Sequence, residues 1–487
     1  MRMGMAMLWS KMAIAAALLV LVVPSVAAQD THFQRDFIAA DFTERRARIF
    51  DAIGKNAIAV VQGGADTGDL STFRQTNEFY YLTGIEVPHA FLLLDGRNRR
   101  ATVYLPNRDA DREKTEGATL AAEDVDLVKR LAGVDNVRAS GDLAEELAGS
   151  GLIRPPAPLL FTPLSPAETV SRDTLLAGQS SRFSDPWDGG GSREGRFKQL
   201  LNARFPQFDV RDLSPILDAL RLVKSAKEIA LIRTATRLSG MAIIEAMRST
   251  QPGIREYELD AAAKYIFFLN GARGEGYASI IGGGRNAYIG HYWRKSATLE
   301  DGDLLLMDYA PDYRYYTSDV ARMWPVNGRY TAEQRELSAF VLAYRDALFR
   351  HTRPGVTSDQ ILDRAALDME KYLASHPIAN PAHAAAARAS LKFRGHFQHS
   401  VGMAVHDVGV LRGVPLKPGM IFTIDPMVWV HEEKLYVRIE DMALVTPDGV
   451  ENLSDFVPSR LDDIARTIAQ PGMLQSQPGA YLRAAPQ

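Results

Sequence analysis

The sequence of 487 residues contains no cysteine. Disulfide bonds, thiolate metal ligands and cysteine nucleophiles are therefore excluded, and any metal ion must be held by oxygen or imidazole nitrogen. Histidine is scarce, with ten residues, so a local concentration of histidines is informative. A strong charge imbalance is also missing. The formal net charge is -3 and no long basic run occurs, which disfavours a nucleic-acid partner.

The N-terminus has the pattern of a secretory signal peptide over residues 1–28. Basic residues flank the start of a short apolar stretch, residues 12–23, and small residues follow at Val26 and Ala28. We therefore expect cleavage near Ala28, a periplasmic or secreted mature protein, and no stable membrane anchor after cleavage. A membrane anchor is the alternative, but an apolar stretch of this length is too short to span a bilayer comfortably.

The remaining chain is long enough for two domains, and its patterns change near residue 222. Residues 29–215 alternate short apolar runs with helical stretches, which is an α/β pattern, and include a loop-like insertion at 178–195. Residues 222–470 begin with a long amphipathic helix and continue with helical and strand-like segments. The fold class is thus α/β (α+β). Residues 471–487 lack periodicity and are predicted to form a flexible tail.

The second domain contains an internal repeat. The segments "PGIREYEL" and "PGVTSDQI" each open a helix, and the later segments "LEDGDLLLMD" and "LKPGMIFTID" end on Asp308 and Asp425 with a glycine in register. Asp319 and Glu440 follow, and each lies nine residues before a glycine. Three aligned features in the same order predict two related halves that pack about a pseudo-twofold axis.

The repeat predicts that four carboxylates converge in one interior: those of Asp308, Asp319, Asp425 and Glu440. Four such groups cannot all ionise beside one another without compensating cations. Two divalent metal ions roughly 3.5–4 Å apart satisfy that demand and form a known hydrolytic arrangement. Arg438, two residues before Glu440 on the same strand face, offers one positive charge, which is too little for four acids. A salt-bridged structural network is the alternative, and it lacks enough nearby cations.

Histidines lie beside these acids. The segment "FRGHFQHSVGMAVHDVG" contains His396, His399 and His406, and His291 lies in "YIGHYWRK", ahead of the first pair of acids. Each histidine alone is more often a satisfied core or surface residue than a ligand. Imidazole combined with carboxylates suits a divalent metal better than a structural network.

Five motifs together resemble a known family. Four are similar to motifs of the pita-bread metallopeptidases, the group of Xaa-Pro aminopeptidase (aminopeptidase P), prolidase and methionine aminopeptidase: "MDYAPDYRYYTSDVARMWPVNG", "GHFQHSVGMAVHDVG", "IFTIDPM" and "YVRIEDMALVT". The fifth, "NEFYYLTGIEVPHAFLLL", is similar to the creatinase-like N-terminal domain, which methionine aminopeptidases lack. The resemblance covers most of the mature chain. It implies a creatinase-like α/β domain followed by a pita-bread catalytic domain.

The resemblance also implies a metal ligand set. Asp308 corresponds to the bidentate ligand of one metal ion, Asp319 and Glu440 to the carboxylates that bridge both ions, and His399 to a ligand of the second ion. Asp425 stands where the family usually has a glutamate that binds metal and transfers a proton, and aspartate is one methylene shorter. Carboxylates and one imidazole favour manganese, with cobalt or zinc as alternatives.

Three further residues match the family near the cleaved bond. His291 and His406 correspond to two histidines that are not metal ligands, and Arg438 matches an arginine just before the last ligand. The family often has another histidine four positions before the metal-binding one. That position is Gly395 here, and His396 lies one position further along.

The implied function is a dinuclear-metal aminopeptidase that hydrolyses the N-terminal Xaa-Pro bond of peptides with proline at the second position. We expect the chain to form a homo-oligomer, a dimer or a tetramer. One alternative is an Xaa-Pro dipeptidase (prolidase). A creatinase-like amidinohydrolase is disfavoured because it needs no metal and lacks most of the ligand carboxylates. A catalytically impaired pita-bread module that binds peptides or proteins stays open because of Asp425 and Gly395.

Overall fold

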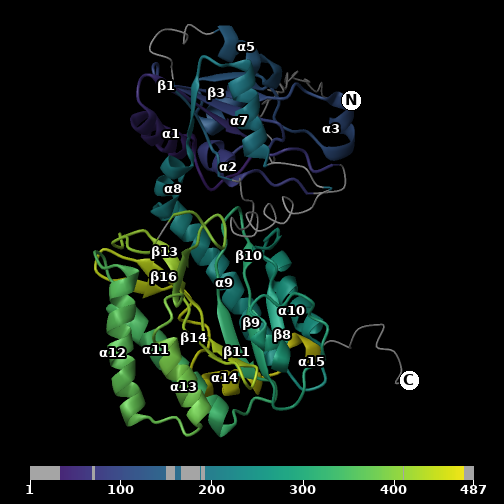
Figure 1. Cartoon of the computed structure of the whole chain (residues 1–487). Helices are drawn as coiled ribbons and strands as arrows, with labels where there is room; N and C mark the ends of the chain where they lie inside the picture. Colours follow the sequence, from purple (N-terminus) through teal and green to yellow (C-terminus); the bar gives the residue numbers. More distant parts are fainter. Residues whose placement is uncertain are drawn as a thin grey trace, which may run out of the picture.

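The computed structural model describes residues 33–68, 72–149, 159–165, 187, 192–409 and 411–476 (Figure 1). The expected signal peptide and most of the insertion at 178–195 lie outside these residues. In Figure 1 an N-terminal domain lies above a larger C-terminal domain, and helix α8 (Ser214–Leu222) connects them. Among the described residues, no helix combines the length and the apolar character needed to cross a bilayer.

The N-terminal domain is built on one mixed sheet with the strand order β4-β3-β2-β1-β5-β6. β1, β2 and β3 pair antiparallel, whereas β4, β5 and β6 join parallel to their neighbours. The strands are β1 (Ala57–Gln62), β2 (Phe91–Asp95), β3 (Arg100–Leu105), β4 (Asn136–Ala139), β5 (Leu159–Thr162) and β6 (Asp209–Asp212). The helices are α1 (Ala39–Ile53), α2 (Asn77–Thr83), α3 (Ala110–Glu116), α4 (Val125–Ala132), η1 (Ser140–Asp142), α5 (Leu143–Gly149) and α7 (Arg193–Arg204).

The C-terminal domain consists of two halves, each with a small antiparallel sheet and helices outside it (Figure 1). The first half contains α9 (Ala226–Ser249), α10 (Glu256–Leu269), β7 (Gly274–Glu275), β8 (Ile280–Gly283), η2 (Gly284–Tyr288), β9 (Leu304–Asp308), β10 (Pro311–Asp312) and β11 (Ala321–Pro325). The second half contains α11 (Ala332–His351), α12 (Ser358–Ser375), α13 (Pro381–Ser390), β12 (Phe397–Ser400), β13 (Ile421–Ile424), β14 (Met427–Val430), β15 (Leu435–Arg438), β16 (Asp441–Val445) and β17 (Val450–Asn452). The short helices α14 (Leu461–Ile468) and α15 (Met473–Ser476) follow.

The predicted internal repeat is confirmed by equivalent backbone contacts in the two halves. Gly253 N–H donates to the carbonyl of Leu299 at 2.8 Å, and Gly355 N–H donates to the carbonyl of Leu416 at 2.9 Å. Both glycines have a positive φ, 91° and 84°, which a residue with a side chain rarely adopts. The two leucines begin the repeated segments that end on the acidic residues. In each half, therefore, the turn that precedes a helix is bonded to the first residue of the segment that leads to the acidic residue.

The two halves meet at a backbone bridge between Ala321 of β11 and Glu440, which directly precedes β16. Glu440 N–H donates to the carbonyl of Ala321 at 3.0 Å, and Ala321 N–H donates back to the carbonyl of Glu440 at 3.3 Å. Behind this bridge, fully buried Asp441 accepts from Arg322 Nη2 at 2.6 Å and from Arg345 Nη1 at 2.9 Å. Arg322 also donates to the carbonyl of Glu440 at 2.8 Å. These contacts fix the backbone of Glu440 against the first half.

The domains share one hydrophobic core, which contains residues of both. Arg221 of α8, which is 1% exposed, joins them through charge as well. Its guanidinium donates to Glu78 Oε1 of α2 at 3.1 Å and to Asp407 Oδ1 of the C-terminal domain at 2.5 Å. Asn77 Nδ2 donates to the carbonyl of Met403 at 3.3 Å. The N-terminal domain therefore contacts the loop that follows β12.

The first residues of the predicted tail, 471–476, are ordered against the C-terminal domain. Residues 471–476 pack on α9 and end in helix α15, because their polar groups bond to the C-terminal end of α9. Gln475 Nε2 donates to the carbonyl of Ser249 at 2.9 Å, and Arg248 Nη2 donates to the carbonyl of Pro471 at 3.0 Å. The sequence prediction is wrong for these residues, and residues 477–487 lie outside the described part.

We expect the substitution Asp441→Ala to lower the free energy of unfolding by about 3–5 kcal/mol, because it leaves buried Arg322 without its carboxylate and removes one of the two carboxylates that pair with Arg345. Denaturation by urea, followed by tryptophan fluorescence, measures the change. The control is Asp463→Ala, which removes the partner of exposed Arg466 and should cost less than about 1 kcal/mol. Equal losses in the two variants would contradict the role of the buried pair.

Candidate metal centre

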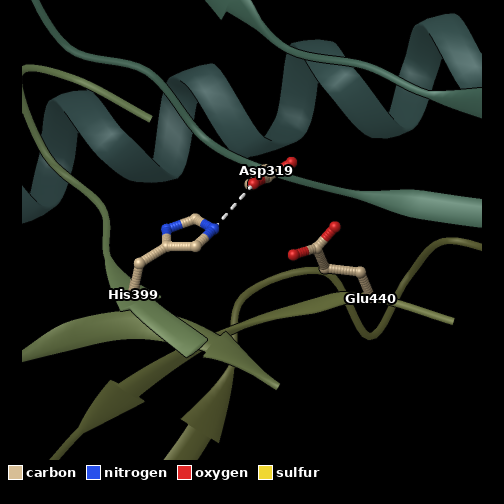
Figure 2. Close-up of side chains that lie close together, drawn as sticks. All are labelled: Asp319, His399 and Glu440. Carbon is tan, nitrogen blue, oxygen red and sulfur yellow. Dashed lines mark ion pairs between the residues drawn. The ribbon is translucent and has the colours of Figure 1, made fainter. Parts of the chain in front are cut away.

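Three side chains from distant parts of the chain meet where the two halves join (Figure 2). They are Asp319, just before β11, His399 of β12, and Glu440, between β15 and β16. Each offers one ligand atom, and the three atoms lie within 4.8 Å of one another. Asp319 and Glu440 are buried, at 3% and 0% exposure. Two carboxylates and an imidazole at this spacing could hold a divalent metal ion.

Strand register explains why Asp308 joins this group. Ala321 of β11 lies opposite Asp308 of β9, and directly opposed residues of an antiparallel pair point to the same face. Asp319 lies two residues before Ala321, just outside β11, and Tyr277 contacts both its carboxylate and that of Asp308. The carboxylates of Asp308 and Asp319 thus lie on the same side of the sheet formed by β8, β9 and β11. This side faces the second half.

Arg438 connects the acids of both halves. Its Nε donates to Asp425 Oδ1 at 2.7 Å, its Nη1 donates to Asp308 Oδ2 at 2.6 Å, and its Nη2 donates to Glu440 Oε2. The structure therefore brings all four predicted acids into one cluster, although Asp308 and Asp425 turn toward the guanidinium. One positive charge still opposes four carboxylates. The four carboxylates therefore outnumber the one guanidinium that contacts them, as the sequence analysis predicts.

Tyr277 is a site residue that the sequence analysis does not identify. Its hydroxyl donates to Asp308 Oδ1 and, at 2.8 Å, lies within hydrogen-bond distance of Asp319 Oδ1. It lies between the short strands β7 and β8, where no periodic pattern marks it. The available signal is chemical, because a buried carboxylate pair requires a nearby donor.

Burial and mutual repulsion control protonation in the cluster. Burial raises the pKa of Asp319 well above its ordinary value, Asp308 raises it further, and Arg438 and Tyr277 lower it in part. Burial also raises the pKa of Glu440 well above its ordinary value; Arg438 opposes this shift, and Asp319 adds to it. Without further cations, the cluster therefore retains protons that free carboxylates would release.

Two observations test whether these residues fit a metal ion. Glu440 Oε1 is buried and has no hydrogen-bond partner among the described residues, so one strong ligand oxygen is left over. His399 Nδ1 lies 3.3 Å from the carbonyl of Ser400, to which only a protonated Nδ1 can donate. His399 Nε2 then carries the lone pair, and it lies 3.5 Å from Asp319 Oδ2. The donor set fits a divalent cation.

The imidazole of His406 packs beside the imidazole of His399. The two ring centroids are 4.0 Å apart, with 44° between the ring planes, and this proximity contributes, after burial, to lowering the pKa of His399 well below its ordinary value. The loop between them is anchored at its start, where Lys224 Nζ donates to Ser400 Oγ at 2.8 Å. The structure therefore places His406 next to the acidic cluster.

The other two histidines lie elsewhere. His291 is exposed in the turn after η2, with no hydrogen bond or ion pair among the described residues. His396 is fully buried and satisfied: its Nε2 lies 2.7 Å from the carbonyl of Ser390, and its Nδ1 accepts from Met427 N–H at 3.3 Å. His396 thus supports the backbone and does not replace the histidine that is absent at Gly395.

Comparisons with known proteins agree with this arrangement. Residues 230–447 match metallopeptidase family M24, and residues 42–152 match the aminopeptidase P N-terminal domain. Together these matches confirm the expected order, a creatinase-like N-terminal α/β domain followed by a pita-bread domain.

Named relatives match over most of their length. The chain is 30% identical to Xaa-Pro aminopeptidase 3 of Rattus norvegicus over 413 residues, which are 81% of this chain and 76% of that protein. It is 29% identical to Xaa-Pro aminopeptidase of Escherichia coli strain K12 over 411 residues, 80% of this chain and 88% of that protein. The structure of proline aminopeptidase P II from Yersinia pestis is similar with a TM-score of 0.71 and 28% identity, over 89% of this chain and 100% of that one.

The raised pKa values predict a pH dependence for metal-free protein. In the unfolded chain Asp319 and Glu440 titrate near their usual values of 3.8 and 4.5, whereas the folded protein holds their protons to higher pH. Their contribution to stability therefore falls as pH rises above about 4.5. In the presence of a chelator, we expect the Tm of the wild type to fall relative to that of Glu440→Gln between about pH 5 and about pH 8. Parallel Tm curves would contradict the shift.

Proposed function

Because the chain belongs to metallopeptidase family M24, we propose that it is an aminopeptidase that hydrolyses the N-terminal Xaa-Pro bond of peptides. The observation that carries the proposal is the meeting of Asp319, His399 and Glu440 beside the Arg438 cluster, at the join between the two halves. Relatives named Xaa-Pro aminopeptidase that match over both domains support this substrate class.

Five residues would hold two divalent metal ions: Asp308, Asp319, His399, Asp425 and Glu440. When bound, such ions supply a Lewis acid for the peptide carbonyl and lower the pKa of a water molecule. We favour manganese, because four carboxylates and one imidazole are a hard, oxygen-rich ligand set. Cobalt and zinc remain alternatives that metal analysis can distinguish.

The residues of the chain itself orient the reactants and move a proton. Tyr277 and Arg438 hold the carboxylates in fixed positions through the hydrogen bonds described above. Asp425 is the proposed acceptor of the water proton, which it passes to the proline nitrogen as the peptide bond breaks. Protonation matters here because the nitrogen of an Xaa-Pro bond carries no hydrogen before cleavage. His406 and His291 are proposed to contact the substrate around the cleaved bond, His291 after movement of its exposed turn.

We also propose that the protein is exported and acts in the periplasm or outside the cell. The support is the N-terminal pattern of a basic start, a short apolar stretch and small residues before Gln29. N-terminal sequencing of the mature protein tests this location, and a start at Met1 would contradict it. We further propose a homo-oligomer, a dimer or a tetramer, from the family resemblance; light scattering tests it.

After reconstitution with manganese, we expect close to two bound ions per chain, and loss of most of them in Asp319→Ala, because this buried carboxylate is among the residues that would hold the ions. Elemental analysis of the desalted protein measures the content. Asp463→Ala, at the surface, is the matched control and should keep both ions. A wild-type chain without bound ions would favour a peptide-binding module over an enzyme.

For catalysis, we expect Asp425→Ala to lower kcat on the peptide Ala-Pro-Ala by about 10²–10⁴-fold, because proton transfer to the leaving nitrogen is lost. Asp425→Asn tests the same step while it keeps the size of the side chain and an acceptor for Arg438. Comparison of Ala-Pro, Ala-Pro-Ala and Ala-Ala-Ala separates an aminopeptidase from a prolidase. Unchanged rates in both variants would remove Asp425 from the mechanism.

A further inference from the structure

The loop from His399 to His406 is closed by its own backbone. Asp407 N–H donates to the carbonyl of Ser400 at 2.8 Å, so the chain returns on itself before it leaves the loop. This closure brings the His399 and His406 rings to a centroid distance of 4.0 Å. Within residues 400–408, every residue is buried except His406, which is half-buried. The loop therefore holds one side chain, that of His406, next to the acidic cluster and buries the others.

The side chain of Asp407 anchors this loop. It is 1% exposed, it accepts from Arg221 Nη2 at 2.5 Å, and its Oδ2 lies 3.6 Å from Lys224 Nζ. Lys224 Nζ also donates to Ser400 Oγ, at the start of the loop. A Cβ atom on Gly402 would overlap Asp407 Oδ2, so the carboxylate lies directly against the loop backbone. Asp407 is therefore fixed both to the loop and to two buried cations.

Helix α2 of the N-terminal domain completes this anchor. It lies at the base of that domain, on the side that meets the C-terminal domain (Figure 1). Glu78 of α2 is buried and accepts from Arg221 Nη1 at 3.1 Å, and the adjacent Asn77 donates to the carbonyl of Met403 in the loop. The two acids, Glu78 and Asp407, are matched by the two cations. Unlike the acidic cluster, this network needs no further cation, and it can hold the loop in place.

We propose that Asp407 is a positioning residue for His406, and that Glu78 supports it through Arg221. The inference rests on the proposed function, in which His406 contacts the substrate around the cleaved bond. Asp407 directly follows His406, so a shift of its anchored carboxylate moves the backbone that carries the imidazole. A displacement of about 1 Å near a reacting bond can lower the rate by about 10²-fold. A side chain of the N-terminal domain thus helps to set the place of a residue beside the metal centre.

The test is a double-mutant cycle with the full-length, manganese-loaded mature protein and the peptide Ala-Pro-Ala. Asp407→Asn keeps the size of the side chain and removes the charge that pairs with Arg221. We expect it to lower kcat by about 10–100-fold, whereas in a His406→Ala background it should lower kcat by less than about twofold. The effect disappears because an imidazole that is absent can no longer be misplaced. A general loss of structure would instead lower kcat by the same factor in both backgrounds.

Glu78→Gln is the second variant, for the case in which Asp407→Asn does not fold. It leaves the contact between Arg221 and Asp407 in place and should lower kcat by about 3–10-fold, again only when His406 is present. Elemental analysis should show an unchanged manganese content in both variants, because neither Glu78 nor Asp407 is among the proposed metal ligands.

The control is Glu86→Gln, which removes the charge from another ion pair between the two domains. Glu86 Oε1 lies 2.6 Å from Arg273 Nη2, and kcat should stay within about twofold of the wild type. An equal loss of kcat with and without His406, or an unchanged kcat in both Asp407→Asn and Glu78→Gln, would overturn the inference. A wild-type protein that does not cleave Ala-Pro-Ala would instead overturn the proposed function.

Discussion

The guanidinium of Arg438 lies between carboxylates that the two halves of the C-terminal domain bring together. It contacts Asp308 from the first half and Asp425 and Glu440 from the second, in a space nearly closed to water. Several buried carboxylates around one positive charge are unfavourable unless further cations bind. The fold therefore brings together more carboxylate groups than Arg438 alone can balance. This excess of negative charge is the physical basis for a metal-dependent activity.

The duplication supplies this arrangement symmetrically, but Arg438 breaks the symmetry. Each half has an aspartate at or directly after the end of one strand and a second acid shortly before a later strand. Two residues before its second acid, however, the first half has Thr317 and the second half has Arg438. A second arginine in place of Thr317 would bring the site closer to neutrality and weaken its attraction for cations. The single arginine thus orders the acids and still leaves them a net negative charge.

Much of the site could be predicted from the sequence because it follows the repeat. Asp308, Asp319 and Glu440 are marked by strand ends, by a fixed spacing to a glycine and by their occurrence in pairs. The structure adds the backbone bridge at Ala321 that brings the pairs face to face. No spacing rule predicts such a contact, since it joins residues more than a hundred positions apart.

The residues that sequence reasoning misses act through contacts between distant segments. Tyr277 belongs to no periodic element, and Lys224 lies at the start of a helix far along the chain from the loop that it holds. His396 lies in the same motif as His399, but the sequence does not reveal that it is buried and bonded to the carbonyl of Ser390 and the backbone of Met427. The predicted start of the tail at residue 471 is too early for a related reason. The sequence of residues 471–476 lacks periodicity, and this does not reveal their hydrogen bonds to the end of α9.

The charged contact at Arg221 has a consequence for the autonomy of the two domains. Arg221 pairs with Glu78 on one side and with Asp407 on the other, and Asp407 directly follows His406. Truncation to the C-terminal domain alone would leave this guanidinium with only part of its compensation and would expose the apolar surface of the shared core. The N-terminal domain is therefore a structural component of the centre that lies below it, and the two are expected to unfold as one cooperative unit.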